Sequence, residues 1–265
     1  MASTGAGAVP ALPRLGLTPL GGAGNLFVKA FTRTPPDLAG PAVEMKKVAE
    51  PTVARLSVYL RVLVELLDSG VTTISSDELA RRSGTTAAQV RKDLSAFGTF
   101  GKRGLGYSVQ ELVDALRSIL GLQRTWRVAL VGAGKIGQAL YGYQDFRRQG
   151  FHIEAVFDSD PAKIGQRWDG VVVQSERELE AGLAERAIDI VIVAVPASAA
   201  QEVVDRVVRA GVRGILNFAP VQLRVPPGVA LKNVNMAVEM EGLSFALARG
   251  AAGRRGAPTG RTAEE

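Results

Sequence analysis

Residues 131–137, which read Val-Gly-Ala-Gly-Lys-Ile-Gly, constrain the fold of this chain more than any other feature of its sequence. They follow a short apolar run and precede a segment with helical spacing, which is the context that a dinucleotide-binding turn requires. Gly132 allows the tight turn, Gly134 lets a pyrophosphate approach the backbone, and Gly137 lets the helix pack closely on the sheet. The sequence therefore predicts a Rossmann-type turn whose helix N-terminus faces the phosphates.

Short apolar runs alternate with segments of helical periodicity along the chain beyond Trp126. The predicted strands are residues 128–131, 153–157, 171–173, 188–195 and 214–218. The predicted helices between them include residues 136–148, 175–186 and 198–210. This alternation predicts a doubly wound α/β domain with a mostly parallel sheet, to which we assign residues 123–235, followed by a helix at residues 236–249.

Asp158 ends the second predicted strand, 26 residues after Gly132. A carboxylate at this place can bind the ribose diol of adenosine and repels a 2′-phosphate, so it favours NAD(H) over NADP(H). The alternatives are a domain that binds another nucleotide, such as coenzyme A, or none. The other residues that we expect to contact the cofactor in this part of the chain are Ala133, Lys135, Ile136 and Lys163.

The residue types in the chain argue against catalysis and against metal binding. There is no cysteine, which excludes disulfides, thiolate zinc sites, iron–sulfur clusters and thiol switches. Dehydrogenase chemistry needs an acid or base near the hydride site, but the only histidine, His152, opens the second strand and is expected at the surface. No lysine or tyrosine is singled out for that task. We therefore predict a cofactor that is bound rather than used, no catalytic residue and no metal site.

Residues 51–122 carry a helix-turn-helix pattern. A long amphipathic segment, residues 52–68, is followed by two capping boxes at residues 75–78 and 86–89, with Gly84 between them for a tight turn. Two short helices, 77–83 and 86–97, are predicted after the long one.

The second short helix has a polar outer face. Val90, Leu94 and Phe97 share its inner face, which leaves the following residues outside: Ala88, Gln89, Arg91, Lys92 and Ser95. Gln and Arg suit base edges, whereas Lys and Ser more often hold phosphates. Lys102 and Arg103 are expected at the tip of a β-hairpin wing. The alternative is a solvated helix face with a basic turn, but the net charge of +6 permits double-stranded DNA as the partner.

Both ends of the chain are rich in Gly, Ala, Pro and Thr and show no periodicity. Residues 1–50 and 250–265 are therefore predicted to be disordered. No apolar run approaches the ~18–20 residues that a membrane helix needs. We expect a cytoplasmic protein with no membrane partner.

Taken together, residues 89–98, 101–107, 131–137 and 214–220, with the Val195-Pro196 and Ala199-Ala-Gln201 segment, resemble the Rex family of redox-sensing transcriptional repressors. The resemblance runs from about residue 51 to residue 249. It implies a homodimer whose N-terminal winged helix binds operator DNA and whose Rossmann domain senses NADH and NAD+. In such proteins NADH binding closes the dimer and releases DNA, and a C-terminal helix, here 236–249, is swapped between subunits.

The resemblance also implies further site residues. Tyr107, Pro196, Asn217 and Phe218 would lie near the nicotinamide side of the pocket. Asn235 is a departure, because the family commonly has an aspartate there that is thought to relay the cofactor state to the DNA-binding domain. Asn keeps the hydrogen-bonding capacity but loses the charge. The rival interpretations are an NAD-dependent oxidoreductase with a helical N-terminal domain and a coenzyme A-binding module.

Overall fold

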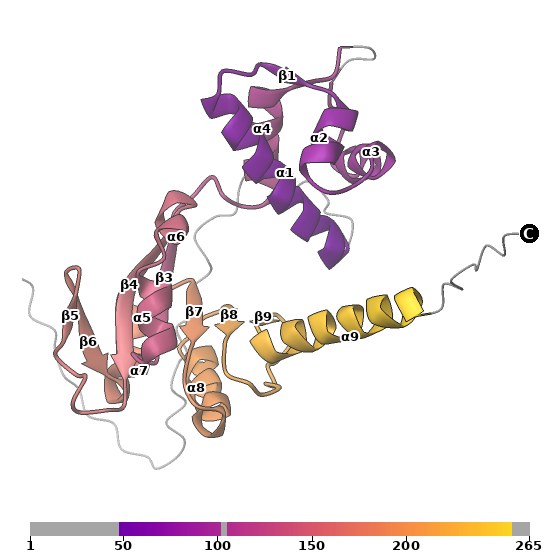
Figure 1. The fold of residues 1–265 in the computed structure, drawn as a ribbon. Coiled ribbons are helices and arrows are strands. Elements are labelled where there is room, and N and C mark those ends of the chain that lie inside the picture. Colours follow the sequence, from indigo (N-terminus) through magenta and orange to yellow (C-terminus); the bar gives the residue numbers. More distant parts are fainter. Residues whose placement is uncertain (1–47, 102–104, 256–265) are drawn as a thin grey trace, which may run out of the picture. The chain divides into compact units, whose positions relative to one another are not determined.

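The computed structural model describes residues 48–101 and 105–255, and Figure 1 shows their fold. The predicted disorder of residues 1–47 and 256–265 lies outside the described residues, as do the wing residues Lys102 and Arg103. None of the described helices is long and apolar enough to cross a membrane.

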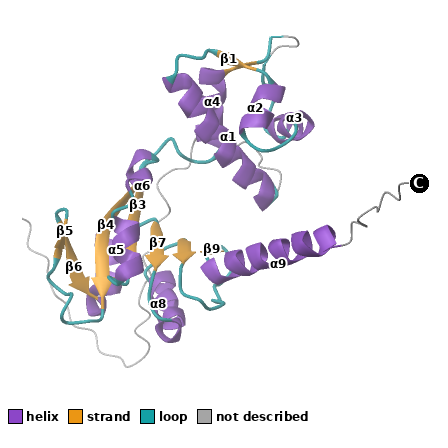
Figure 2. Cartoon of the chain, viewed as in Figure 1, coloured by secondary structure: helices purple, strands orange, loops and turns teal. Residues whose placement is uncertain are grey.

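The N-terminal domain contains four helices and a two-stranded antiparallel sheet (Figure 2). The helices are α1 (Glu50–Asp68), α2 (Ser76–Arg82), α3 (Ala87–Ser95) and α4 (Val109–Ile119), and the strands are β1 (Thr73–Ile74) and β2 (Tyr107–Ser108). Helix α1 begins at Glu50, so this residue does not belong to the predicted disordered arm. Helix α4 was not predicted from the sequence, although its buried residues Val109, Leu112, Val113 and Leu116 recur at helical spacing.

The predicted capping residues begin α2 and α3. The Ser75 hydroxyl accepts from the backbone N–H of Glu78 at 3.1 Å, and the Thr86 hydroxyl accepts from Gln89 at 3.2 Å. The Glu78 carboxylate, which a capping box would turn back to Ser75, pairs with Arg81 and with Arg82. These side-chain caps satisfy N–H groups that a helix cannot pair by itself.

The predicted wing differs from a simple hairpin. Strand β2 pairs with β1, in the register Ile74 with Tyr107, and the described residues 98–101 on the other side of the loop form no strand. Gly101 and Gly106 have φ values of 75° and 79°, and a Cβ on Gly101 would strike the carbonyl oxygen of Gly106. The two sides of the loop therefore approach each other at two glycines.

The C-terminal domain is built on one seven-stranded sheet in the order β5-β6-β4-β3-β7-β8-β9. The strands are β3 (Trp126–Val131), β4 (Phe151–Asp158), β5 (Arg167–Trp168), β6 (Val171–Ser175), β7 (Ile190–Val193), β8 (Gly214–Asn217) and β9 (Ala230–Asn233). Only β5 pairs in antiparallel fashion. The six parallel strands follow the 3-2-1-4-5-6 order of a doubly wound dinucleotide fold, and the order reverses between β3 and β7.

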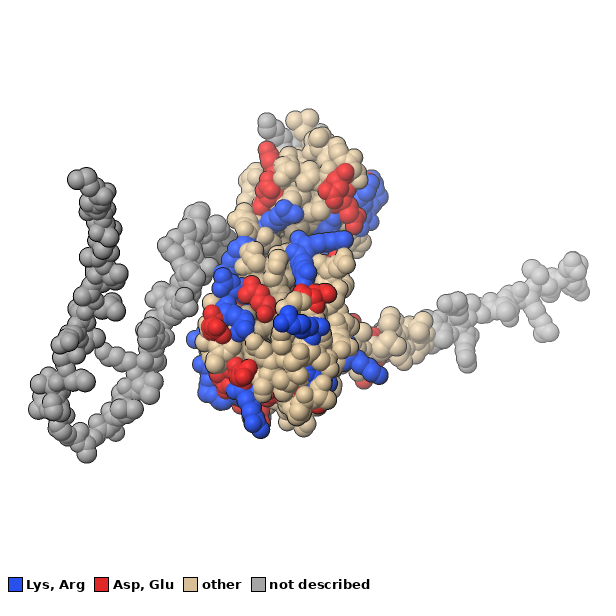
Figure 3. Space-filling view, turned by 90° about the vertical axis from the view of Figure 1, so that its left-hand side faces the viewer, with Lys and Arg blue, Asp and Glu red and all other residues tan. Residues whose placement is uncertain are grey.

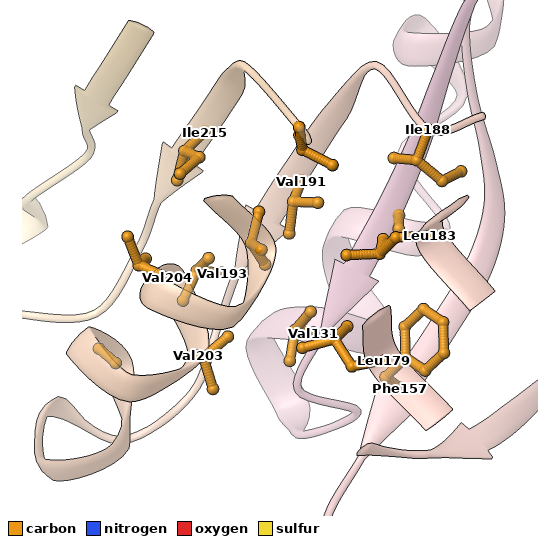
Figure 4. Close-up of a cluster of buried hydrophobic side chains, with 14 of the residues drawn as sticks. Val131, Phe157, Leu179, Leu183, Ile188, Val191, Val193, Val203, Val204 and Ile215 are labelled. Atoms are coloured by element: carbon orange, nitrogen blue, oxygen red, sulfur yellow. The ribbon is translucent and has the colours of Figure 1, made fainter. Parts of the chain in front are cut away.

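Helices cover the sheet on both faces, as alternation along the strands requires. Ala129 and Val131 of β3 belong to one buried cluster, with residues of α7 (Leu179–Glu185) and α8 (Ala197–Arg209), whereas Val128 and Leu130 belong to another. Figure 4 shows the first cluster, in which Leu179 and Leu183 lie beside Phe157. Leu140 and Phe146, from α5 (Lys135–Tyr141) and α6 (Gln144–Arg148), pack on the second cluster.

Several predicted boundaries are wrong. The helix expected at 136–148 is two helices, because the backbone turns at Gly142 and becomes extended at Tyr143, with ψ of 98°. The strand expected at 188–195 covers only residues 190–193, and β5 and β9 were not predicted. Helix α7 is preceded by a 3-10 turn, η1 (Glu176–Glu178). The last helix, α9 (Met236–Arg255), continues past residue 249, so residues 250–255 are helical and not part of a disordered tail.

Candidate cofactor and nucleic-acid sites

The Gly-rich turn lies at the carboxyl end of β3, next to the end of β7. Gly132 has a φ of 105°, and a Cβ there would lie 2.7 Å from the carbonyl carbon of Ala194. The backbone N–H of Gly132 donates to Phe157 at 2.8 Å, and that of Ala194 donates to Val131 at 2.8 Å. The structure thus brings the turn close to residues 194–195, which directly precede the predicted site residue Pro196, at the point where the strand order reverses.

Gly134 and Gly137 have different surroundings. A Cβ on Gly137 would clash with the carbonyl oxygen of Gly132, so this glycine is needed where α5 packs on the turn. A Cβ on Gly134 would have no protein atom within 4 Å. Open space above the backbone at Gly134, beside the exposed first-turn residues Lys135 and Ile136, fits a pyrophosphate approaching this helix.

Asp158 is buried at the end of β4, and its carboxylate is tied to the turn. One oxygen accepts from the backbone N–H of Ala133 at 2.6 Å and from the Lys163 ammonium at 3.2 Å, and the other accepts from Asp160 at 2.8 Å. Burial raises the pKa of Asp158, but these hydrogen bonds outweigh burial and keep the pKa below its usual value. Asp158 therefore stays ionised and shapes the turn, in addition to the ribose contact predicted for it.

The other predicted cofactor residues are spread over several elements. Phe218 is half-buried, and its N–H donates to Val193 at 2.8 Å, which places it beside β7. Tyr107 belongs to β2 of the N-terminal domain, where burial raises its pKa. Asn217 is buried, and its amide binds the protein's own groups. The cofactor contacts of these three residues remain predictions. His152 is exposed at the start of β4, as predicted.

The polar face predicted for α3 is exposed in large part. Val90 and Leu94 are buried, whereas the following residues are exposed: Ala88, Arg91, Lys92 and Ser95. The Arg91 guanidinium donates to the Ser76 hydroxyl at 2.8 Å, which links α3 to the first turn of α2. Gln89 is half-buried, and its amide donates to Asp93 at 2.8 Å. This bond uses one of the two hydrogens on Nε2, so the other hydrogen and Oε1 stay available for the predicted base contact.

Asp93 is a buried charged residue of α3 for which the sequence predicted no role. It is 2% exposed and accepts from the Arg55 guanidinium at 2.7 and 2.8 Å and from the Tyr59 hydroxyl at 3.0 Å. Burial of the carboxyl raises its pKa, but the bonds from Arg55, Gln89 and Tyr59 outweigh it, and the pKa is lowered. The sequence feature that could have identified Asp93 is its position three residues after Val90, on the inner face of α3. Asp93 fixes the orientation of α3 on α1.

The charges on the face that Figure 3 shows do not by themselves mark a DNA site. On the face that Figure 3 shows, Lys and Arg side chains are interspersed with Asp and Glu. Among the described residues, Arg148 pairs with Asp145 at 3.5 Å and Arg124 pairs with Asp189 at 3.1 Å. The assignment of DNA binding to α3 therefore rests on the motif and its geometry.

Two family descriptions match separate parts of the chain. Residues 123–221 match a family described as "CoA binding domain". Residues 47–95 match one described as "Putative DNA-binding protein N-terminus". The first covers the sheet up to the segment after β8, and the second covers α1 to α3.

Curated relatives match across both domains. Redox-sensing transcriptional repressor Rex of Carboxydothermus hydrogenoformans is 49% identical over 203 residues, which are 77% of this chain and 98% of the relative. Redox-sensing transcriptional repressor Rex 1 of Thermotoga maritima is 45% identical over 205 residues, again 77% of this chain and 98% of the relative.

Solved structures also match this chain across both domains. RSP in complex with beta-NADH is 38% identical, with a TM-score of 0.72 over 79% of this chain and 99% of RSP. RSP in complex with beta-NAD+ and operator DNA is 39% identical, with a TM-score of 0.75 over 82% of this chain and 100% of RSP. The predicted fold class, a DNA-binding domain followed by a Rossmann domain with a mostly parallel sheet, is confirmed.

The two glycines of the turn allow a matched test. Gly134→Ala should leave the free energy of unfolding within ~0.5 kcal/mol, because its Cβ meets no protein atom, yet it should weaken NADH binding at least ~10-fold by blocking the pyrophosphate. Gly137→Ala should instead lose ~1–3 kcal/mol of stability by overpacking. Denaturant unfolding and NADH fluorescence titration measure both effects. Wild-type NADH affinity in Gly134→Ala would place the pyrophosphate elsewhere.

The Asp93 network predicts a pH-dependent stability. Asp93→Ala should cost about 2–3 kcal/mol, because the buried Tyr59 hydroxyl loses its acceptor, whereas Asp114→Ala, at an exposed position of α4, should cost less than ~0.5 kcal/mol. Because the folded-state pKa of Asp93 is lowered, the stabilisation by its charge is present above the unfolded-state pKa of ~3.9 and is lost as the pH falls through the folded value. The difference in stability between wild type and Asp93→Asn should therefore shrink below about pH 4, as measured by urea unfolding. A difference that stays constant down to pH 2 would contradict this role of the ionised carboxylate.

Proposed function

Because the chain belongs to the Rex family of redox-sensing transcriptional repressors, we propose that it binds operator DNA through α3 and senses NADH and NAD+ through the turn between β3 and α5. The observation that carries the proposal is that one chain combines a capped helix-turn-helix with a Gly-x-Gly-x-x-Gly turn open at Gly134. The family consists of repressors, which favours this function over the oxidoreductase alternative. A repressor acts where its DNA lies, so we place it in the cytoplasm.

The DNA-binding half of the proposal rests on α3. Arg91 would read a base edge, because its guanidinium presents paired donors, and Lys92 and Ser95 would hold phosphates. The Asp93 network would hold α3 on α1 with its outer face open to the major groove. The wing residues Lys102 and Arg103 would add phosphate or minor-groove contacts.

The sensing half rests on the chemistry that distinguishes the two cofactors. NADH and NAD+ share their adenosine, ribose and pyrophosphate groups and differ at the nicotinamide ring in charge and planarity. Contacts at Gly134 and Asp158 therefore serve both cofactors equally, and discrimination must arise near Pro196 and Phe218, together with Tyr107. The relative RSP has been solved with beta-NADH, and with beta-NAD+ and operator DNA together, which supports NADH as the cofactor that releases DNA.

A DNA titration tests this function. A labelled duplex, selected from a random-sequence pool for tight binding, is titrated with the protein at fixed salt, alone and with saturating NADH or NAD+. NADH should weaken binding by roughly 5–150-fold, the usual range of a coupling between two sites. NAD+ should change it much less, because a ligand with equal affinity for both states shifts nothing. An unmoved curve with NADH would refute the sensor function.

Two variants assign the DNA contact in the same assay. Arg91→Ala should lower affinity by ~1–3 kcal/mol and relax the preference at one base pair. Ser76→Ala is the matched control, because it removes only the bond that Arg91 makes within the protein. Equal losses in both variants would mean that Arg91 acts by positioning α3. Coenzyme A is added as a competitor of NADH, because residues 123–221 match the CoA-binding family.

We further propose a homodimer formed through α9. The following apolar residues of α9 are each more than half exposed in the single chain: Met236, Val238, Met240, Leu243 and Leu247. Four of them recur at spacings of four, three and four, which is one face of a helix, and Val238 lies on another side. A helix with apolar side chains around it is normally buried, so a second copy of this chain would cover it.

Sedimentation equilibrium tests the dimer. The wild type should sediment as a dimer, and the double variant Leu243→Glu with Leu247→Glu should sediment as a monomer, because two charges would have to be buried. Glu241→Gln, on the same helix, is the control and should remain a dimer. A monomeric wild type, or a double variant that still dimerises, would contradict the role of α9.

A further inference from the structure

A pair of side-chain amides joins the ends of β8 and β9. Asn217, the last residue of β8, is 1% exposed, and its Nδ2 donates to Oδ1 of Asn233 at 2.9 Å. The same Nδ2 donates to the carbonyl oxygens of Ala219 and Val221 at 3.1 and 3.2 Å. Its Oδ1 accepts from the Ala219 N–H at 2.9 Å. Because Ala219 N–H can only donate, it fixes which end of the Asn217 amide faces it.

The Asn217 amide has no spare hydrogen for a cofactor. Nδ2 carries two hydrogens and already has three acceptors within the protein, one of which must share a hydrogen. The resemblance to the family implies that Asn217 lies near the nicotinamide. In the structure, the Asn217 side chain instead bonds the backbone of the loop at residues 218–221 and holds that loop in one conformation. Asn217 is therefore a positioning residue.

The pair lies between the cofactor side of the sheet and α9. On one side, the loop begins at Phe218, whose N–H is bonded to Val193 of β7 beside the Gly-rich turn. On the other side, Val234 N–H donates to the Asn217 carbonyl at 2.8 Å. Asn235 then caps α9, because its Oδ1 accepts from the N–H groups of Ala237 and Val238 at 3.0 and 3.4 Å. These hydrogen bonds, together with the peptide bonds between neighbouring residues, connect β7 to the first turn of α9.

A hollow of about 320 Å³ adjoins the pair. It is bounded by the loop on one side and by the start of α9 on the other, and its lining includes Ala219, Gln222, Asn233, Asn235 and Glu239. The first turn of α9 is therefore not packed tightly on the loop. Near this hollow, directional bonds through Asn217, Asn233 and Val234 connect the loop to the segment that leads into α9.

We propose that the Asn217–Asn233 amide pair couples the loop at residues 218–221 to the direction in which α9 leaves the sheet. This inference rests on the proposed function, since it assigns to the pair the transmission of the NADH signal toward the dimer and its DNA. A change of the loop at the nicotinamide end moves the Asn217 amide, and Asn233 moves with it because the bond is directional. Asn235 carries the shift into α9, because its side chain caps the first turn of that helix.

Asn233 offers the sharper test, because it is exposed and can be changed without opening the core. Asn233→Ala removes the acceptor for Asn217. Asn233→Asp keeps that acceptor and is the rescue variant. Gln222→Ala is the control, because Gln222 lines the same hollow and its side chain makes no hydrogen bond to any described residue. Asn217→Asp is the severe variant, because it turns a carboxylate oxygen toward three acceptors.

Two quantities are measured for each full-length variant: the NADH dissociation constant and the factor by which saturating NADH weakens DNA binding. Asn233→Ala should lower that factor at least ~3-fold, while the NADH dissociation constant stays within ~3-fold of the wild-type value. A change of this size can be measured, because couplings between two sites are usually roughly 5–150-fold. Asn233→Asp and Gln222→Ala should keep the wild-type factor. If Asn233 acted only in packing, Asn233→Ala would lower the denaturant midpoint of unfolding and leave the effect of NADH on DNA binding unchanged.

The outcomes separate this inference from the proposed function. If NADH leaves DNA binding by the wild type unchanged, the proposed function fails and the coupling pair fails with it. If the wild type responds and Asn233→Ala responds equally, only the coupling pair is overturned. A parallel loss of NADH affinity and coupling in Asn233→Ala would also overturn it, because Asn233 would then belong to the cofactor site itself. Should Asn217→Asp not fold, the Asn233 variants still decide the question.

Discussion

The close approach of the Gly132 turn to the end of β7 is the constraint on which the cofactor site depends. With a φ of 105° and the Ala194 carbonyl in the space that a Cβ would occupy, position 132 accepts no side chain. The neighbouring strands β3 and β7 can then be joined by backbone hydrogen bonds up to their last residues, while the chain leaves them toward opposite faces of the sheet. The crevice for a dinucleotide opens where the two directions separate.

Three polar or charged residues are buried in the described part of the chain, and each holds a functional segment. Asp93 orients α3 on α1, Asp158 holds the Gly-rich turn at the end of β4, and Asn217 shapes the loop after β8. Burying such a group costs free energy unless its hydrogen bonds are made, so each one selects a single geometry for its neighbours. Apolar packing is not directional and could not position these segments as narrowly.

Sensing a redox state imposes a further requirement. Most contacts to a nicotinamide cofactor contribute equally to both of its forms, so they supply affinity without a signal. A signal needs an element that differs between two states and reaches the DNA-binding domain. The loop at residues 218–221 and α9 are connected by hydrogen bonds, and α9 carries apolar side chains that the single chain leaves exposed. The contacts that supply affinity for the cofactor and the segments that transmit the signal are thus assigned to different parts of the C-terminal domain.

The sequence by itself determined the Rossmann turn, the alternation of strands and helices, the two helix caps and the inner face of α3, because each depends on residues within a few positions of one another. Tertiary structure alone decided which groups the buried side chains of Asp93 and Asn217 meet, since their partners Arg55 and Asn233 lie on other elements. It also decided the short strands β5 and β9, which exist only because a neighbouring strand offers free backbone groups. Local periodicity specifies which face of an element is apolar, whereas long-range contacts specify which polar groups meet.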